Sequence, residues 1–390
     1  MPTAVNPELA AKKAEDTPEA AAIKAIIPLS ELKHMLKIVA AAVKGTSTIP
    51  VLQCVRMEQI ESGFALEATD LDVYIRAILQ KHPGPKTPVL IPAQKFAAWT
   101  KLLSGDDVKI SATDRRATMQ CGRARATLPV WAADHWPRND VYKMKADGIT
   151  LTQGDFARAL RFALIAMSTE ESRSTLNGIL LQGDGEQLRL VATDGHRLMI
   201  YALPCTEKIT LLLPGQFIRA LLPLLTDEDG GIDLFSDDNM ILCRIDGDMR
   251  ISVGAPKLTG QFPNYEAVIP KTNTAEITAN SADLLASLER SALLSDERSG
   301  LVTLAFDKQI TLTAASAANG ESEETVDCIG SPQEALKIGV YAQYLIDLMK
   351  RLDGDVRIAL PESNHMPLLL TAAPHEGETL SYIVMPMRLD

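Results

Sequence analysis

Apolar positions along the chain follow two different periods. In six stretches they recur every three or four residues, as Phe156, Leu160 and Leu164 do, which is the spacing of a helix with one buried face. We expect Ser30 and Ser281 to act as the N-caps of two of these helices. The predicted helices cover residues 30–44, 93–103, 154–168, 215–225, 281–294 and 342–352.

Between the helices the period falls to two, or the sequence is rich in residues that favour strands. Asp-Gly pairs at 184–185, 229–230 and 246–247 predict tight turns between such strands. The clearest predicted strands cover residues 63–68, 107–111, 187–191, 232–235 and 309–313.

The helical stretches recur at nearly constant intervals, which indicates an internal repeat. Their first large apolar residues are separated by 64, 60, 61, 67 and 60 residues and are Leu32, Phe96, Phe156, Phe217, Leu284 and Tyr344. A longer period of 124 residues separates Leu32 from Phe156 and also separates the Ala-Thr-Asp at 68–70 from the Ala-Thr-Asp at 192–194.

This double period predicts an α+β protein with three similar domains, each containing two helices packed against antiparallel sheets. Polar, turn-rich segments set the expected boundaries. We expect domain 1 at residues 26–146, domain 2 at 147–272 and domain 3 at 273–390. Residues 1–25 are predicted to be a mobile N-terminal tail.

Charge is distributed unevenly between these elements. The chain of 390 residues has a net charge of −11, but the six predicted helices together carry about +6, which leaves about −17 for the rest. Solvated outer faces are the ordinary explanation for basic helices. The alternative is that the helices share one surface that faces a polyanion, with contacts to a nucleic-acid backbone and no sequence preference.

Several classes of protein are excluded by composition and spacing. No stretch is long and apolar enough to cross a membrane, and 18 aromatic residues are too few for a base-stacking platform. The five cysteines and six histidines have no metal-ligand spacing, and no nucleotide-binding motif is present, so we expect no metal and no cofactor. Scattered cysteines favour a reducing, cytoplasmic location.

The densest polar cluster is Thr193-Asp194-Gly195-His196-Arg197. Asp194 and His196 could be acid–base partners in a hydrolase, or the cluster could be a turn that follows the strand at 187–191. The corresponding segment of domain 1, Thr69-Asp70-Leu71-Asp72, has no histidine, which favours the turn. We therefore expect no catalytic residue and keep the hydrolase as the less favoured alternative.

Four motifs in domains 2 and 3 resemble the bacterial DNA sliding clamp family, the beta subunit of DNA polymerase III. They are Leu176-Asn177-Gly178, Val191 to Leu198, Phe262-Pro263-Asn264-Tyr265 with Val268-Ile269-Pro270, and the C-terminal Val384-Met385-Pro386-Met387-Arg388-Leu389. The similarity extends over residues 26–390.

The resemblance implies a non-catalytic processivity factor: a head-to-tail homodimer that forms a ring around duplex DNA. Its implied partners are DNA polymerase subunits, the clamp loader and other replication or repair proteins that carry short clamp-binding peptides, with no membrane partner. A specialised paralogue of the clamp, such as an inhibitor-resistance or plasmid copy, is the alternative within the family.

The resemblance also implies three sets of residues. The partner-peptide pocket would contain Leu176, Thr193, Gly195, His196, Arg197, Leu198, Pro263, Val268, Met366, Ile383, Val384, Met385, Pro386, Met387 and Arg388. The DNA-facing cations would be Lys33, Lys37, Lys44, Lys95, Lys101, Arg158, Arg161, Arg173, Arg219, Arg290, Arg298, Lys350 and Arg351. The dimer interface would join Arg123, Arg125, Ala126 and Leu128 to Leu293, Leu294, Glu321, Glu323 and Glu324.

Three positions depart from the family pattern. Ala267 and Thr46 stand where the family often has arginine, in the pocket rim and in a DNA-contacting loop respectively. Ala126 stands where the family often has an aromatic residue in the dimer interface.

Overall fold

The computed structural model describes residues 23–85, 87–113, 115–137, 141–144, 148–170, 172–227 and 229–389. They form two compact units, one from the chain up to Asn139 with Asp246–Ser252, the other from Asp140–Ile245 and Val253–Asp390. Of the predicted tail, residues 1–22 lie outside the described residues, whereas residues 23–25 already belong to the first strand.

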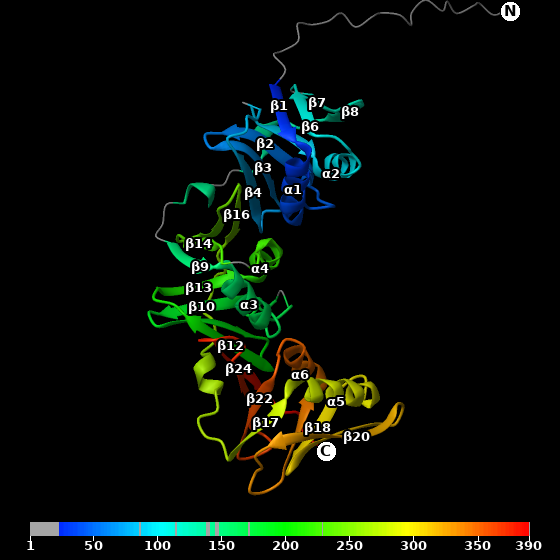
Figure 1. Cartoon of the computed structure of the whole chain (residues 1–390), viewed down its shortest axis with the longest axis vertical. Coiled ribbons are helices and arrows are strands. Elements are labelled where there is room, and N and C mark those ends of the chain that lie inside the picture. The colour runs from blue at the N-terminus through cyan, green and yellow to red at the C-terminus, as the bar shows by residue number, and fades with distance from the viewer. Residues whose placement is uncertain are drawn as a thin grey trace, which may run out of the picture. The chain divides into compact units, whose positions relative to one another are not determined.

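The same order of elements occurs three times along the described chain (Figure 1). It is a strand, a helix, four strands, a second helix and three strands. This threefold order confirms the predicted α+β class with two helices in each repeat. All six predicted helices and the five clearest predicted strands are present, although most helices end earlier than expected.

Domain 1 contains two sheets and a pair of helices that pack together. The sheet order is β1-β6-β7-β8 in one sheet, while β5-β2-β3-β4 are neighbours in the other. Helix α1 buries Leu32, Met35 and Val39. The elements are β1 (Ile23–Pro28), α1 (Leu29–Val39), β2 (Cys54–Ile60), β3 (Gly63–Thr69), β4 (Tyr74–Gln80), β5 (Val89–Pro92), α2 (Ala93–Lys101), β6 (Asp107–Ala112), β7 (Arg116–Cys121) and β8 (Ala124–Pro129).

Domain 2 repeats this order. Helix α3 buries Phe156 and Leu160, two of the apolar positions that predicted it, and packs on β11 and β12, while the third, Leu164, is its C-cap. The elements are β9 (Gly148–Thr152), α3 (Gln153–Ala163), β10 (Gly178–Asp184), β11 (Gln187–Thr193), β12 (Arg197–Pro204), β13 (Lys208–Pro214), α4 (Gly215–Leu221), β14 (Gly231–Ser236), β15 (Met240–Ile245) and β16 (Met249–Pro256).

Domain 3 completes the series, and its two helices lie side by side (Figure 1). The elements are β17 (Ala275–Asn280), α5 (Ser281–Leu294), β18 (Leu301–Phe306), β19 (Gln309–Ser316), β20 (Gly320–Ile329), β21 (Leu336–Tyr341), α6 (Ala342–Met349), β22 (Asp355–Leu360), β23 (Leu368–Ala372) and β24 (Thr379–Val384).

Domains 2 and 3 share one continuous sheet within the second unit. Its strand order is β13-β10-β11-β12-β24-β23-β22-β17-β20-β19-β18-β21. Strand β12 of domain 2 pairs antiparallel with β24 of domain 3, with Arg197 opposite Val384 and Tyr201 opposite Leu380. We call this pairing the β12–β24 seam; it fixes the C-terminal strand beside the Thr193–Arg197 turn.

The two predicted N-caps were wrong. The N-cap of α1 is Pro28, without a capping side chain, and the N-cap of α5 is Asn280, whose side chain accepts from the backbone N–H of Ala282 and Asp283. Ser281 is buried and its hydroxyl donates to the carbonyl of Leu352 at 3.1 Å. Because each helix follows a strand without a loop, its cap is the last residue of that strand.

In the described part of the chain no helix is both long and apolar enough to cross a membrane.

Candidate functional site

A cavity of about 200 Å³ lies where the turn between β11 and β12 meets the segment after β16 and the end of β24. Most of its lining belongs to the predicted pocket. The predicted residues that line it are Leu176, Thr193, Gly195, Arg197, Leu198, Pro263, Val268, Ile383 and Met385. The sequence reasoning missed Asn264 and Tyr265, although both belong to the Phe-Pro-Asn-Tyr motif that pointed to this region.

The remaining predicted pocket residues are His196, Met366, Val384, Pro386, Met387 and Arg388, and they do not line this cavity. Val384 is fully buried in β24. The backbone N–H of Met387 donates to the carbonyl of Gly339 at 2.8 Å, so the C-terminal segment is held on β21. His196 is exposed, and its carbonyl accepts from the N–H of Met385.

The cavity has an apolar floor and an apolar rim. Val191, Leu198, Phe262, Tyr265 and Ile383 form a buried cluster beneath it. On the rim, Val268 and Met385 are 46% and 40% exposed, which is high for large apolar side chains. Such a surface can gain free energy by covering these side chains with an apolar ligand.

The Thr193–Arg197 turn is stabilised by its own side chains. The Asp194 carboxylate accepts from the backbone N–H of His196 at 2.9 Å and of Arg197 at 3.0 Å, and the Thr193 hydroxyl donates to the carbonyl of Arg197. Gly195 has a φ of 93°, a backbone conformation that L side chains rarely adopt. The absence of a side chain also leaves the backbone of the cavity wall accessible.

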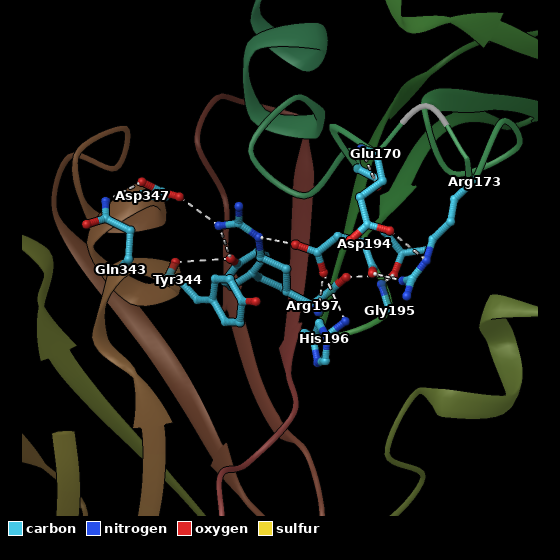
Figure 2. Close-up of polar contacts among 12 residues, drawn as sticks. Glu170, Arg173, Asp194, Gly195, His196, Arg197, Gln343, Tyr344 and Asp347 are labelled. Atoms are coloured by element: carbon cyan, nitrogen blue, oxygen red, sulfur yellow. Dashed lines mark hydrogen bonds and ion pairs between the residues drawn. The ribbon is translucent and has the colours of Figure 1, made fainter. Parts of the chain in front are cut away.

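Arg197 connects this turn to domain 3 (Figure 2). Its Nε donates to Asp194 Oδ2 at 3.0 Å and its Nη1 donates to Asp347 Oδ2 on α6 at 2.7 Å. The guanidinium lies 4.4 Å from the centre of the Tyr344 ring. One residue of the cavity wall therefore ties domain 2 to α6.

A second ionic cluster lies at the opposite end of the β12–β24 seam. Arg158 on α3 donates to Glu378 at 2.9 and 2.6 Å, and Tyr201 on β12 donates to the same carboxylate. Burial alone would raise the pKa of Glu378, but hydrogen bonds from Arg158 and Tyr201 outweigh it and hold the pKa below its usual value. Arg158, predicted to face DNA, is thus a partner of a buried carboxylate.

The remaining predicted DNA-facing cations lie on the helices or in the segments that follow them. Lys33 and Lys37 are on α1, Lys95 and Lys101 on α2, Arg161 on α3, Arg219 on α4 and Arg290 on α5. Those beyond helix ends are Lys44, Arg173, Arg298, Lys350 and Arg351.

The predicted interface residues occupy one surface in each of two domains. Strand β8 is the edge of its sheet; Arg125 lies on this strand and Arg123 just before it, and both are exposed, while Ala126 and Leu128 are partly exposed. In domain 3, Leu293 at the end of α5 is 77% exposed, Leu294 is partly buried, and Glu321 and Glu323 are exposed on β20. Glu324 is already paired within the chain, since it accepts from Arg290 Nε at 2.9 Å.

Comparison with known proteins gives a consistent result along the whole described chain. Family models of the DNA polymerase III beta subunit match its N-terminal domain at residues 23–140, its central domain at 150–264 and its C-terminal domain at 266–388. The beta sliding clamp of Escherichia coli (strain K12) is 28% identical over 372 residues, covering 92% of this chain and 99% of that protein. The clamp of Pseudomonas putida is 29% identical over 368 residues, covering 91% and 96%.

Solved structures agree. The DnaN sliding clamp of Pseudomonas aeruginosa bound to griselimycin is similar with a TM-score of 0.85 at 26% identity, covering 94% of this chain and all of that one. The DNA polymerase sliding clamp of Bacillus subtilis gives a TM-score of 0.86 at 22% identity, which supports the fold.

Three consecutive repeats of one α+β domain, together with these matches, define a DNA sliding clamp, a non-catalytic processivity subunit of a replicative polymerase. The chain belongs to the DNA polymerase III beta subunit family.

The hydrolase alternative is therefore excluded. Asp194 instead uses its carboxylate to hold the turn and Arg197. In the described residues, no group of three or more His, Cys, Asp or Glu side chains could hold a metal ion.

Proposed function

We propose that two copies of this chain join head to tail into a ring around duplex DNA, and that partner proteins dock short peptides in the cavity beside Gly195. The polymerase subunits, the clamp loader and other replication or repair proteins would share this cavity in the cytoplasm. A polymerase tethered in this way stays at high effective concentration beside its template.

The observation that carries the proposal is the apolar cavity at the β12–β24 seam. Its floor is apolar, its rim exposes Val268 and Met385, and Gly195 lets a peptide backbone come close. A flexible methionine adapts to differently shaped side chains, which suits a site used by several partners.

The proposed dimer contact pairs an exposed strand edge with an acidic surface. Strand β8 has unpaired backbone groups on its outer side, and Arg123 and Arg125 flank them. Glu321 and Glu323 have the opposite charge and no ion pair within the described residues, and Leu293 adds apolar area. A contact between two different surfaces closes into a ring of two protomers when a twofold rotation relates one protomer to the other.

The ring is tested by its topology. Protein loaded onto a nicked circular duplex should stay bound through gel filtration, and cutting the circle should release it. Equal retention on circular and linear DNA would reject an encircling ring. A solution mass of one protomer at working concentration would reject the dimer.

The cavity is tested separately with matched substitutions. Met385→Glu places a charge on its apolar rim, and Ile329→Glu places the same charge on a 76% exposed apolar residue of β20, outside the cavity lining. We expect Met385→Glu to abolish capture of the polymerase subunit and processive synthesis, while Ile329→Glu retains both. Equal effects of the two substitutions would contradict a peptide site at the cavity.

A further inference from the structure

The predicted DNA-facing cations fall into two groups according to whether a carboxylate already holds them. In domains 2 and 3 five of them are in ion pairs with N–O distances of 2.5 to 3.0 Å. The pairs are Arg158 with Glu378, Arg161 with Asp227, Arg173 with Glu170, Arg290 with Glu324 and Lys350 with Glu289.

Domain 1 differs. Lys37 on α1, Lys44 just after it, and Lys95 and Lys101 on α2 are exposed, and none has an ion pair within the described residues. Lys33 donates to the carbonyl of Leu103 at 2.9 Å, which leaves its charge unneutralised. Because α1 and α2 pack together, Lys33, Lys37, Lys95 and Lys101 belong to one pair of helices.

Three cations of domains 2 and 3 also lack a carboxylate partner in the described chain. Arg219 and Arg298 have no ion pair there, and Arg351 donates to the carbonyl of Asp347 at 2.7 Å. In the described residues, all five candidate cations of domain 1 therefore lack an ion pair, whereas most of the candidate cations of domains 2 and 3 have one.

Pairing changes what a cation can offer to a phosphate. An unpaired surface lysine releases counterions when it meets DNA, and that release supplies most of the affinity of sequence-independent binding. A cation in an exposed ion pair can exchange its carboxylate for a phosphate at little cost, since such pairs are worth about 0–1 kcal/mol. The carboxylate then stays beside the phosphate and repels it, so the net gain is small.

We propose that the unpaired lysines of α1 and α2 make most of the phosphate contacts of each protomer, and that the paired cations of domains 2 and 3 contribute little. This inference rests on the proposed encirclement of DNA. Domain 1 would then hold the duplex loosely, and the helices of domains 2 and 3 would present little net charge to it.

The test compares two charge-matched double variants. Lys37→Gln with Lys95→Gln removes two unpaired cations, and Arg161→Gln with Lys350→Gln removes two paired ones. Binding of each full-length protein to a short labelled duplex is measured over a series of salt concentrations, and the slope of log affinity against log salt counts phosphate contacts. Thermal unfolding checks that both variants keep the wild-type fold.

We expect the lysine variant to lower the slope by about 4, since a ring of two protomers loses four contacts and each removes about 0.9. The control variant should lower it by less than about 1 by the same relation. Equal losses, or a larger loss in the control, would overturn the inference while leaving the clamp function standing. Failure of the wild-type protein to bind duplex at low salt would instead reject DNA encirclement itself.

Discussion

Leu71 and Gly195 occupy the same position of the same turn in domains 1 and 2. Their φ angles are 82° and 93°. The N–H of Leu71 donates to the Thr69 hydroxyl at 3.0 Å, and the N–H of Gly195 donates to the Thr193 hydroxyl at 3.1 Å. Asp70 accepts from the N–H groups of Asp72 and Val73, and Asp194 accepts from the N–H groups of His196 and Arg197. The turn therefore imposes a positive φ whichever residue stands there.

Gly195→Ala should destabilise the protein by about 1 kcal/mol, because a residue other than glycine at positive φ is strained. The new Cβ would lie 3.5 Å from Arg173 Nη1, an ordinary contact, so the cost comes from the backbone. Leu71→Gly should change stability by less than about 1 kcal/mol, since relief of strain is offset by the greater freedom of glycine in the unfolded chain. Urea unfolding measures both, and a Gly195→Ala protein as stable as wild type would contradict the argument.

Local features of this kind were predictable from sequence. The repeated Ala-Thr-Asp marked both turns, and apolar spacing located all six helices, because each signal lies within one element and its neighbours. The partners of the charged side chains were not predictable in this way. Glu378 is 220 residues from Arg158, and Asp347 is 150 residues from Arg197, so only the folded chain shows that these arginines hold domains together.

The repeat also exposes a difference that sequence reasoning missed. In domain 1, Arg56, Glu67 and Arg76 are neighbours across β2, β3 and β4, and in domain 2 the neighbours across β10, β11 and β12 are all apolar. That second set is Leu180, Val191 and Ile200, which belong to the apolar floor of the cavity or pack against it. The ionic set is extended by Trp136, whose indole N–H donates to the buried Glu67 at 3.0 Å.

Glu67→Gln should destabilise domain 1 by about 3 kcal/mol, because removing one partner leaves two largely buried guanidinium groups less well paired. Replacing the three ionic residues with their domain 2 counterparts, Arg56→Leu, Glu67→Val and Arg76→Ile, together with Trp136→Phe to remove the indole donor, should cost less than the single change. Burying apolar groups of similar size in place of ions is often neutral or stabilising. Tryptophan fluorescence in a urea titration follows the single variant, and circular dichroism follows both.

The reverse order of stability, with the multiple variant below Glu67→Gln, would show that the ionic set contributes net stability to domain 1. The ionic set would then stabilise domain 1 more than apolar side chains at the same positions would.

Glu378 gives the β12–β24 seam a defined dependence on pH. Its pKa in the folded protein lies below the ordinary value of 4.5, so the folded state favours the charged carboxylate. The stability that this provides is complete above about pH 4.5 and is lost as the pH falls through the lower folded value. Wild type and Glu378→Gln should therefore differ in free energy of unfolding at neutral pH and converge on acidification. A difference that stays constant down to low pH would contradict this assignment.

Arg197 and Asp347 should be energetically coupled, because their ion pair is shielded from water. Their side chains are 13% and 26% exposed, whereas Arg161 and Asp227 form an ion pair of similar length, 2.8 Å, at 45% and 79% exposure. A double-mutant cycle with Arg197→Ala and Asp347→Ala should give a coupling free energy of about 1–2 kcal/mol, within the range found for contacting residues. The same cycle for Arg161 and Asp227 should give less than about 0.5 kcal/mol, as exposed pairs do. Both pairs lie in the second unit, so one unfolding transition reports both. Equal coupling in the two cycles would mean that burial does not strengthen the contact between Arg197 and Asp347.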